Sequence, residues 1–302
     1  MKPGALSNNL QGALWILASC LAATVMTVGV KMASDGLAST QIVFVRCVLS
    51  LAMTAPFLIA YGRKVLFSRR WKMHLLRGAI GAISMNAGFY ALGELPITTA
   101  SVLFFSTPLF MTALAGPMLG EKVGIHRWGA TLVGFAGIVV VVNPGIETIE
   151  FAMLSALVSA ALFAVMLIQG KQLSKDDPPG TLMVYFMVMS TLASMPPALT
   201  HWEWPDTDLW IVLVVLSIGA TARVYFDIKA YAVGEASAIS VFQYLRLITI
   251  AFAGYLVFAE IPDERTILGA GLIVASTLYI AQREAVRQRR ARAGGKAADA
   301  SD

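Results

Sequence analysis

Ten long apolar segments joined by short polar loops constrain the fold of this chain more than any other feature of its sequence. A helix needs about 20 mostly apolar residues to cross a hydrocarbon layer about 30 Å thick. The segments that meet this requirement are residues 11–32, 39–62, 73–93, 97–119, 127–143, 151–170, 180–200, 208–230, 236–258 and 265–282. The sequence therefore predicts an all-α polytopic membrane protein with ten transmembrane helices, whose loops leave no room for a folded soluble domain.

The composition agrees with a lipid environment and argues against a nucleic-acid partner. Hydrophobic residues make up 57% of the 302 residues and charged residues 14%, whereas a soluble domain carries about a quarter charged residues. The formal net charge is +5, but the basic residues lie between apolar segments and in the C-terminal tail. This distribution is typical of membrane topology.

The basic residues also predict the orientation. Of the 23 lysines and arginines, 17 fall on the side of the N-terminus, two (Lys31 and Arg265) fall in loops on the other side, and four lie within the spans. Because cytoplasmic loops are enriched in Lys and Arg, both termini are predicted to face the cytoplasm of a bacterial-type inner membrane.

The chain contains an internal repeat. Val25-Met26 and Lys31 match Val165-Met166 and Lys171 at an offset of 140, Tyr90-Ala91-Leu92-Gly93-Glu94 matches Tyr231-Ala232-Val233-Gly234-Glu235 at 141, and Glu121 matches Glu260. These anchors keep the same order in both halves. They predict two five-helix repeats, residues 1–145 and 146–284, followed by a basic cytoplasmic tail, 285–302, that we expect to be disordered.

An odd number of spans per repeat means that the second repeat enters the membrane from the opposite side. Inverted repeats are an architecture of secondary transporters, because two similar halves allow two similar states that open to opposite sides. The alternative is a duplication that only stabilises the fold. The pattern favours transport.

Several motifs resemble the EamA-type half of the drug/metabolite transporter superfamily. They are YALGELP at 90–96, Pro108, LGEK at 119–122, the glycines at 129, 134 and 137, and QIVFVRCVLSL at 41–51. The resemblance implies a central cavity lined by the first, third, fourth, sixth, eighth and ninth spans, and family members that export amino acids and related metabolites. The second repeat departs from this pattern, because Thr249 rather than a proline lies near the position equivalent to Pro108. This difference predicts a straighter ninth span.

Charged residues inside the spans are the sharpest functional candidates, since each costs about 2.5–3.5 kcal/mol at a helix centre. Arg246 lies deepest, with Gln243 and Tyr244 beside it, and its guanidinium could hold a substrate carboxylate through two parallel hydrogen bonds. Arg223 and Asp227, four residues apart, are candidates for a gate or for proton coupling, or alternatively form a structural clasp. Asp227 is the only carboxylate that we place inside a span.

The remaining candidates are weaker. Arg77 and Arg46 are expected to be structural charges, Arg77 by extending to the membrane surface and Arg46 by pairing with a carbonyl or a helix end. Pro108 is assigned to the gate. Possible cavity residues, each of which could instead be ordinary core, are Asn86, Tyr90, Ser101, Phe105, Trp15, Met26, Phe163 and Met166. The small-residue pairs Ala130/Gly134 and Gly271/Ala275 predict close helix contacts.

The sequence lacks the motifs of an enzyme. His74, His126 and His201 are too scattered for a metal site or a catalytic pair, and no phosphate-binding loop or hydrolase motif occurs. We therefore expect no enzyme activity, no cofactor and no metal. The expected partners are the lipid bilayer and a small-molecule substrate, with the oligomeric state open and a monomer plausible.

The functional prediction is a secondary transporter that exports small metabolites, amino acids first, by alternating access. The alternative is a transporter of organic anions such as phosphorylated sugars or nucleotide conjugates. Cationic drug efflux is disfavoured because arginines in the pathway would repel the cargo.

Overall fold

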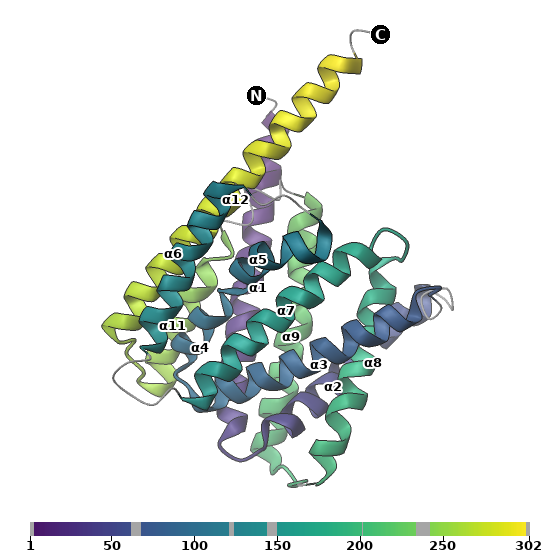
Figure 1. Cartoon of the computed structure of the whole chain (residues 1–302). Coiled ribbons are helices and arrows are strands. Elements are labelled where there is room, and N and C mark those ends of the chain that lie inside the picture. Colours follow the sequence, from purple (N-terminus) through teal and green to yellow (C-terminus); the bar gives the residue numbers. More distant parts are fainter. Residues whose placement is uncertain are drawn as a thin grey trace.

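The computed structural model describes residues 3–61, 68–120, 124–143, 150–200, 202–233 and 242–299, and all regular structure in these ranges is helical (Figure 1). The helices are α1 (Pro3–Ser34), α2 (Ser39–Tyr61), α3 (Trp71–Glu94), α4 (Ile97–Phe104), α5 (Thr107–Leu119), α6 (Ile125–Val142), α7 (Phe151–Leu173), α8 (Pro179–Thr200), α9 (Thr207–Val233), α11 (Leu245–Phe258) and α12 (Glu264–Asp299).

The predicted all-α membrane architecture of ten spans in two inverted repeats is confirmed. Each predicted segment coincides with one helix or with a broken helix. Among the described residues, seven helical stretches are long and apolar enough to span a membrane, and Ser39–Ala55 and Leu245–Phe258 are shorter apolar helices. α12 continues as a helix to Asp299, where we had expected a disordered tail. Its Ala, Arg, Glu and Gln residues favour helix.

The fourth span is broken in the middle. α4 ends at Phe104, α5 begins at Thr107, and Phe105 and Ser106 form a turn between them. Pro108 occupies the first turn of α5, where a missing backbone N–H costs nothing because that group has no intrahelical partner.

The ninth span is broken at the equivalent place, so the prediction that it would be straighter is wrong. Gln243 and Tyr244 are turn residues, and α11 starts at Leu245. The break precedes Thr249 and requires no proline. Arg246 is the second residue of α11, as Pro108 is the second residue of α5.

The packing of the helices has the two-fold pattern that an inverted repeat requires. α1 packs against α9, and its repeat equivalent α7 packs against α3. α2 packs on α8 and α6 on α12, each pair joining equivalent spans of the two halves (Figure 1). The two repeats are therefore interlocked rather than side by side.

Small residues allow α6 and α12 to approach closely. A Cβ added to Gly269 would lie 2.7 Å from the carbonyl oxygen of Gly137, and one added to Gly134 would lie 2.6 Å from Ser276 Oγ. The expected contact at Gly134 is thus present. Gly271 has open space around it, so the pair Gly271/Ala275 does not mark this contact.

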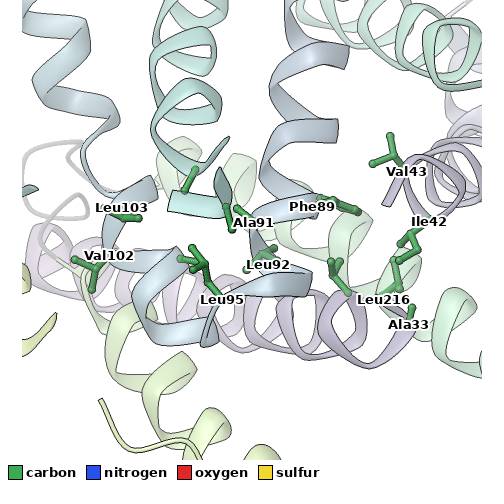
Figure 2. Packing of buried hydrophobic residues seen from close by; sticks show 14 of the residues in the cluster. Ala33, Ile42, Val43, Phe89, Ala91, Leu92, Leu95, Val102, Leu103 and Leu216 are labelled. Carbon is green, nitrogen blue, oxygen red and sulfur yellow. The ribbon is translucent and has the colours of Figure 1, made fainter. Parts of the chain in front are cut away.

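The two ends of the bundle differ in packing. We call the end where α1 begins and α12 leaves the bundle the terminal end, and the opposite end the distal end (Figure 1). The main buried cluster lies toward the distal end, where side chains of several helices fill the space between them (Figure 2). Its members include Ala33, Ile42, Leu92, Leu95, Val102, Leu103 and Leu216.

Candidate functional site

A cavity of about 2050 Å³ occupies the half of the bundle toward the terminal end. Its wall includes Leu119 at the end of α5, Lys171 near the end of α7 and Gly180 near the start of α8. In the other direction it extends to Leu92 and Ser101, close to the buried cluster. The cavity therefore reaches the terminal end and stops at the packed distal half.

Polar contacts between the repeats reinforce the closed distal end. The Lys31 ammonium lies 3.7 Å from Glu260 Oε1 and donates a hydrogen bond of 2.8 Å to the carbonyl oxygen of Leu95. The backbone N–H of Ile97 donates to Glu260 Oε2 at 2.8 Å. We call this set, Lys31, Leu95, Ile97 and Glu260, the distal clasp. It ties the end of α1 and the start of α4 to the segment after α11.

The wall of the cavity is basic. Six cationic side chains line it, and no aspartate or glutamate occurs among the described lining residues. The cations are Arg46, Arg77, Arg127, Lys171, Arg223 and Arg246. A low-dielectric cleft lined by one sign of charge concentrates ligands of the opposite sign. The cavity is therefore suited to anionic groups.

The predicted trio Arg246, Gln243 and Tyr244 lies together in this wall. Gln243 Nε2 donates to the Tyr231 hydroxyl at 2.8 Å, and the Tyr244 hydroxyl donates to Thr277 Oγ1 at 2.6 Å. Both neighbours of Arg246 are thus held in place by contacts to other helices. The position of Arg246 in the first turn of α11 adds the positive end of a helix dipole.

The pair Arg223 and Asp227 lies at the contact between α9 and α1. Arg223 Nη1 is 3.7 Å from Asp227 Oδ2, and the Ser19 hydroxyl donates to Asp227 Oδ1 at 2.5 Å. Arg223 is in the cavity wall, whereas Asp227 is not among the lining residues. Ser19 was not predicted to belong to this pair. A serine within an apolar helix, which needs a partner, was the available signal.

Arg77 and Arg46 have different surroundings. Arg77 is buried and donates from Nε to the carbonyl oxygen of Met166 at 3.2 Å and from Nη1 to that of Leu182 at 3.1 Å. Its guanidinium thus bridges α7 and α8, and its extension to the membrane surface stays a prediction. Arg46 Nη1 lies 2.7 Å from the thioether sulfur of Met85 rather than at a carbonyl, and its buried Nε has no partner in the part of the chain that the structure describes.

The weaker candidates divide into two groups. Met26, Ser101, Phe105, Pro108 and Phe163 line the cavity. Asn86, Tyr90, Trp15 and Met166 do not.

The candidates outside the wall pack against other helices. Asn86 Nδ2 donates to Ser194 Oγ at 2.9 Å, and the Tyr90 ring packs edge-on against Phe151. The cavity face of α3 follows Gly81, Met85, Gly88 and Leu92, so Asn86 and Tyr90 are rotated away from it.

Some lining residues lie on helices outside the six spans that the family resemblance implied as the cavity wall. α2 and α8 contribute Ser50, Thr54 and Phe186, although neither span belongs to that set. Arg127 and Lys171 were counted only as topology signals, yet both lie in the wall. Their positive charge was visible in the sequence, but it was interpreted only as a sign of membrane topology and not as part of a cavity wall.

Comparison with known proteins identifies relatives along almost the whole chain. The S-adenosylmethionine uptake transporter of Rickettsia prowazekii is 32% identical, covering 91% of this chain and 94% of the relative. The riboflavin transporter of Vibrio cholerae is 34% identical, covering 94% and 97%. The pseudopaline exporter CntI of Pseudomonas aeruginosa is 27% identical, covering 90% and 96%. These relatives are all small-molecule transporters.

A solved crystal structure shares the fold, with a TM-score of 0.63 and 16% sequence identity over 90% of this chain and 98% of its own. The model of the EamA-like transporter family matches residues 10–143 and again residues 150–282, one match in each repeat. The chain therefore belongs to the EamA-like transporter family.

Proposed function

We propose that this protein is an inner-membrane secondary transporter that exports small metabolites carrying a carboxylate, amino acids first among them, from the cytoplasm. One observation carries the proposal: six cationic side chains and no described carboxylate line the cavity. Such a wall attracts an anionic group and repels a cationic drug.

The direction of loading follows from the charge distribution. The segments at the terminal end hold most of the lysines and arginines, which supports a cytoplasmic location for that end. The cavity reaches that end and is closed at the other. In this state a metabolite would enter from the cytoplasm, as an exporter requires.

The inverted repeat supplies the proposed second state. Rocking one repeat against the other about the central site would open the distal half and close the terminal half. The distal clasp and the buried cluster would then separate. Arg223 and Asp227 are the proposed gate or coupling pair, and the helix break beside Pro108 gives the fourth span a place to bend.

A second candidate cargo is a larger organic anion, such as a phosphorylated sugar or a nucleotide conjugate. The cavity volume of about 2050 Å³ favours it, since it exceeds what ordinary small-molecule sites of about 300–1,000 Å³ provide. The relatives named for S-adenosylmethionine and riboflavin also support a cargo larger than one amino acid. The S-adenosylmethionine relative is named for uptake and the pseudopaline relative for export, so the names of the relatives support neither direction alone.

Transport into proteoliposomes tests the proposal. Labelled amino acids, phosphorylated sugars, S-adenosylmethionine and riboflavin are offered in parallel to vesicles with and without the protein. Saturable amino-acid transport supports the leading cargo, and saturable transport of phosphate esters alone supports the second. Transport only of compounds that carry neither a carboxylate nor a phosphate group, such as riboflavin, overturns both.

A further inference from the structure

Three arginines in the cavity wall, each on a different helix, have a donor that the fold does not use. Arg46 of α2, Arg223 of α9 and Arg246 of α11 each have a buried Nε without a hydrogen-bond partner among the described residues. Arg77, in the same wall, uses its Nε on a carbonyl oxygen. A buried donor that is left unpaired costs about 1–3 kcal/mol, so each of these guanidinium groups keeps a donor that a ligand could use.

The three guanidinium groups belong to one electrostatic cluster. All three line the same cavity, and the guanidinium of Arg223 lies within electrostatic range of Arg246, Arg46 and Asp227. Among the described residues, Asp227 is the carboxylate within electrostatic range of Arg223, so one negative charge accompanies three positive charges in this part of the wall. Uncompensated charge at this depth is expensive, and an anion with two charges would neutralise it.

The uncapped start of α11 strengthens the same preference. The side chain of the N-cap residue Tyr244 makes no capping hydrogen bond to this helix, whose second residue is Arg246. The positive end of its dipole therefore adds to the field of the guanidinium groups. Broken helices in transporters place such ends against anionic groups of their substrates.

Asp227 is positioned as a counter-ion that can be displaced. Its Oδ1 is fixed by Ser19, while Oδ2 stays 3.7 Å from Arg223 Nη1, beyond hydrogen-bond distance. An incoming oxygen at about 2.8 Å would contact the guanidinium more closely. The carboxylate would balance the charge of the empty site and give way to the cargo.

We propose that Arg46, Arg223 and Arg246 form a subsite for a doubly charged oxygen anion of the cargo, and that Asp227 is its resident counter-ion. A dicarboxylate and a phosphate monoester share this chemistry. The inference rests on the proposed function because it treats the cavity as the transport site, but it concerns binding and can be tested without transport.

The experiment measures binding of succinate, inorganic phosphate and acetate to the full-length protein in detergent by calorimetry at constant pH and ionic strength. Succinate or phosphate should bind at least about tenfold more tightly than acetate, as expected for charge-assisted contacts. A preference for succinate identifies a dicarboxylate cargo, and a preference for phosphate identifies a phosphate ester.

Variants locate the binding. R46Q, R223Q and R246Q should each weaken dianion binding about tenfold, and R223K should also weaken it because lysine lacks the planar fork. D227N should tighten binding, since the competing carboxylate is removed. R265Q removes one positive charge at an exposed site in the first turn of α12 and should leave binding unchanged. Size-exclusion profiles and melting temperatures establish that each variant is folded.

Equal binding of acetate and both dianions, or equal loss in R265Q and R246Q, overturns the inference. Dianion binding that D227N weakens overturns the role of Asp227. If the protein transports metabolites but fails this binding test, only the inference falls. If it binds dianions but transports nothing, only the proposed function falls.

Discussion

The Lys31 ammonium of α1 lies 3.7 Å from the carboxylate of Glu260, and this ion pair joins the first repeat to the second at the distal end. Each partner also bonds the backbone of the α3–α4 connection, Lys31 at the carbonyl of Leu95 and Glu260 at the N–H of Ile97. The pair thus connects three segments that must separate if the distal end opens. It stabilises the state in which the cavity reaches only the terminal end.

K31A should make the distal end easier to open. A cysteine at Val102, which is buried in the distal cluster, reports the opening when the native Cys20 and Cys47 are replaced. Alkylation of V102C by a membrane-impermeant maleimide in right-side-out vesicles should rise about fivefold, the factor that corresponds to about 1 kcal/mol. E260Q should act in the same direction, and the double variant should add little because both remove one interaction. Unchanged alkylation in both single variants would show that the pair does not hold the distal end closed.

Arg246 should be required for cargo affinity. Loss of charged hydrogen bonds worth about 1.5–3 kcal/mol predicts that R246Q raises the KM of transport about tenfold to hundredfold. R246K should also be impaired, because an ammonium cannot form two parallel bonds to a carboxylate. The control is R265Q, which lowers the net charge equally at an exposed position. Transport by R246Q at the wild-type rate and KM would contradict the role of Arg246 as an anchor.

The contact between α6 and α12 should tolerate no added methyl group at Gly269. G269A would place a Cβ 2.7 Å from the carbonyl oxygen of Gly137, and the forced shift should cost about 1–3 kcal/mol. G271A, two residues along the same helix, meets nothing within 4 Å and should be neutral or stabilising by up to about 1 kcal/mol. Melting temperatures in detergent compare the two. Equal melting temperatures would mean that the helices are not in close contact there.

Asp177, in the connection between α7 and α8, should confer stability that depends on pH. Burial opposes its ionisation, but hydrogen bonds from His74 and Ser68 outweigh this effect and lower the pKa of the carboxyl group. A lowered pKa contributes stability that is complete above the unfolded value of about 3.9 and is lost as the pH falls through the folded value.

D177N should therefore lower the melting temperature at pH 7, and the difference from wild type should shrink as the pH falls below about 4. D176N is the matched control, since Asp176 pairs with Arg70 at an exposed site, with 59% of its side chain accessible. It should have little effect at either pH. A deficit in D177N that stays constant down to pH 3 would assign the effect to packing rather than to ionisation.

The sequence predicted the helices because each span is long, apolar and bounded by charges, and it predicted the repeat because Lys31, Glu94 and Glu121 have counterparts in the same order. It failed on the ninth span because it tied the break to proline. The structure places the break at Gln243 and Tyr244 without one. The position of a helix break can depend on packing between helices, which the presence or absence of one residue type does not predict.

The site was predicted in part for a similar reason. Arg246, Gln243 and Phe105 were found because charge and aromatic character stand out in apolar segments. Asn86 also stands out, but it bonds Ser194 of α8 outside the cavity wall. Which face of a helix borders a cavity depends on the rotation of that helix against its neighbours. A chain of helices that are apolar on all sides carries little record of that rotation.

Competition by esters tests most directly whether the basic cavity selects its cargo by negative charge. Proteoliposomes that transport a labelled carboxylate-bearing metabolite are challenged with the unlabelled acid and with its methyl ester, which has the same skeleton without the charge. If the cavity selects by negative charge, the acid should inhibit at least about tenfold more strongly than the ester, because the ester loses the charge-assisted hydrogen bonds. Equal inhibition by acid and ester would contradict it.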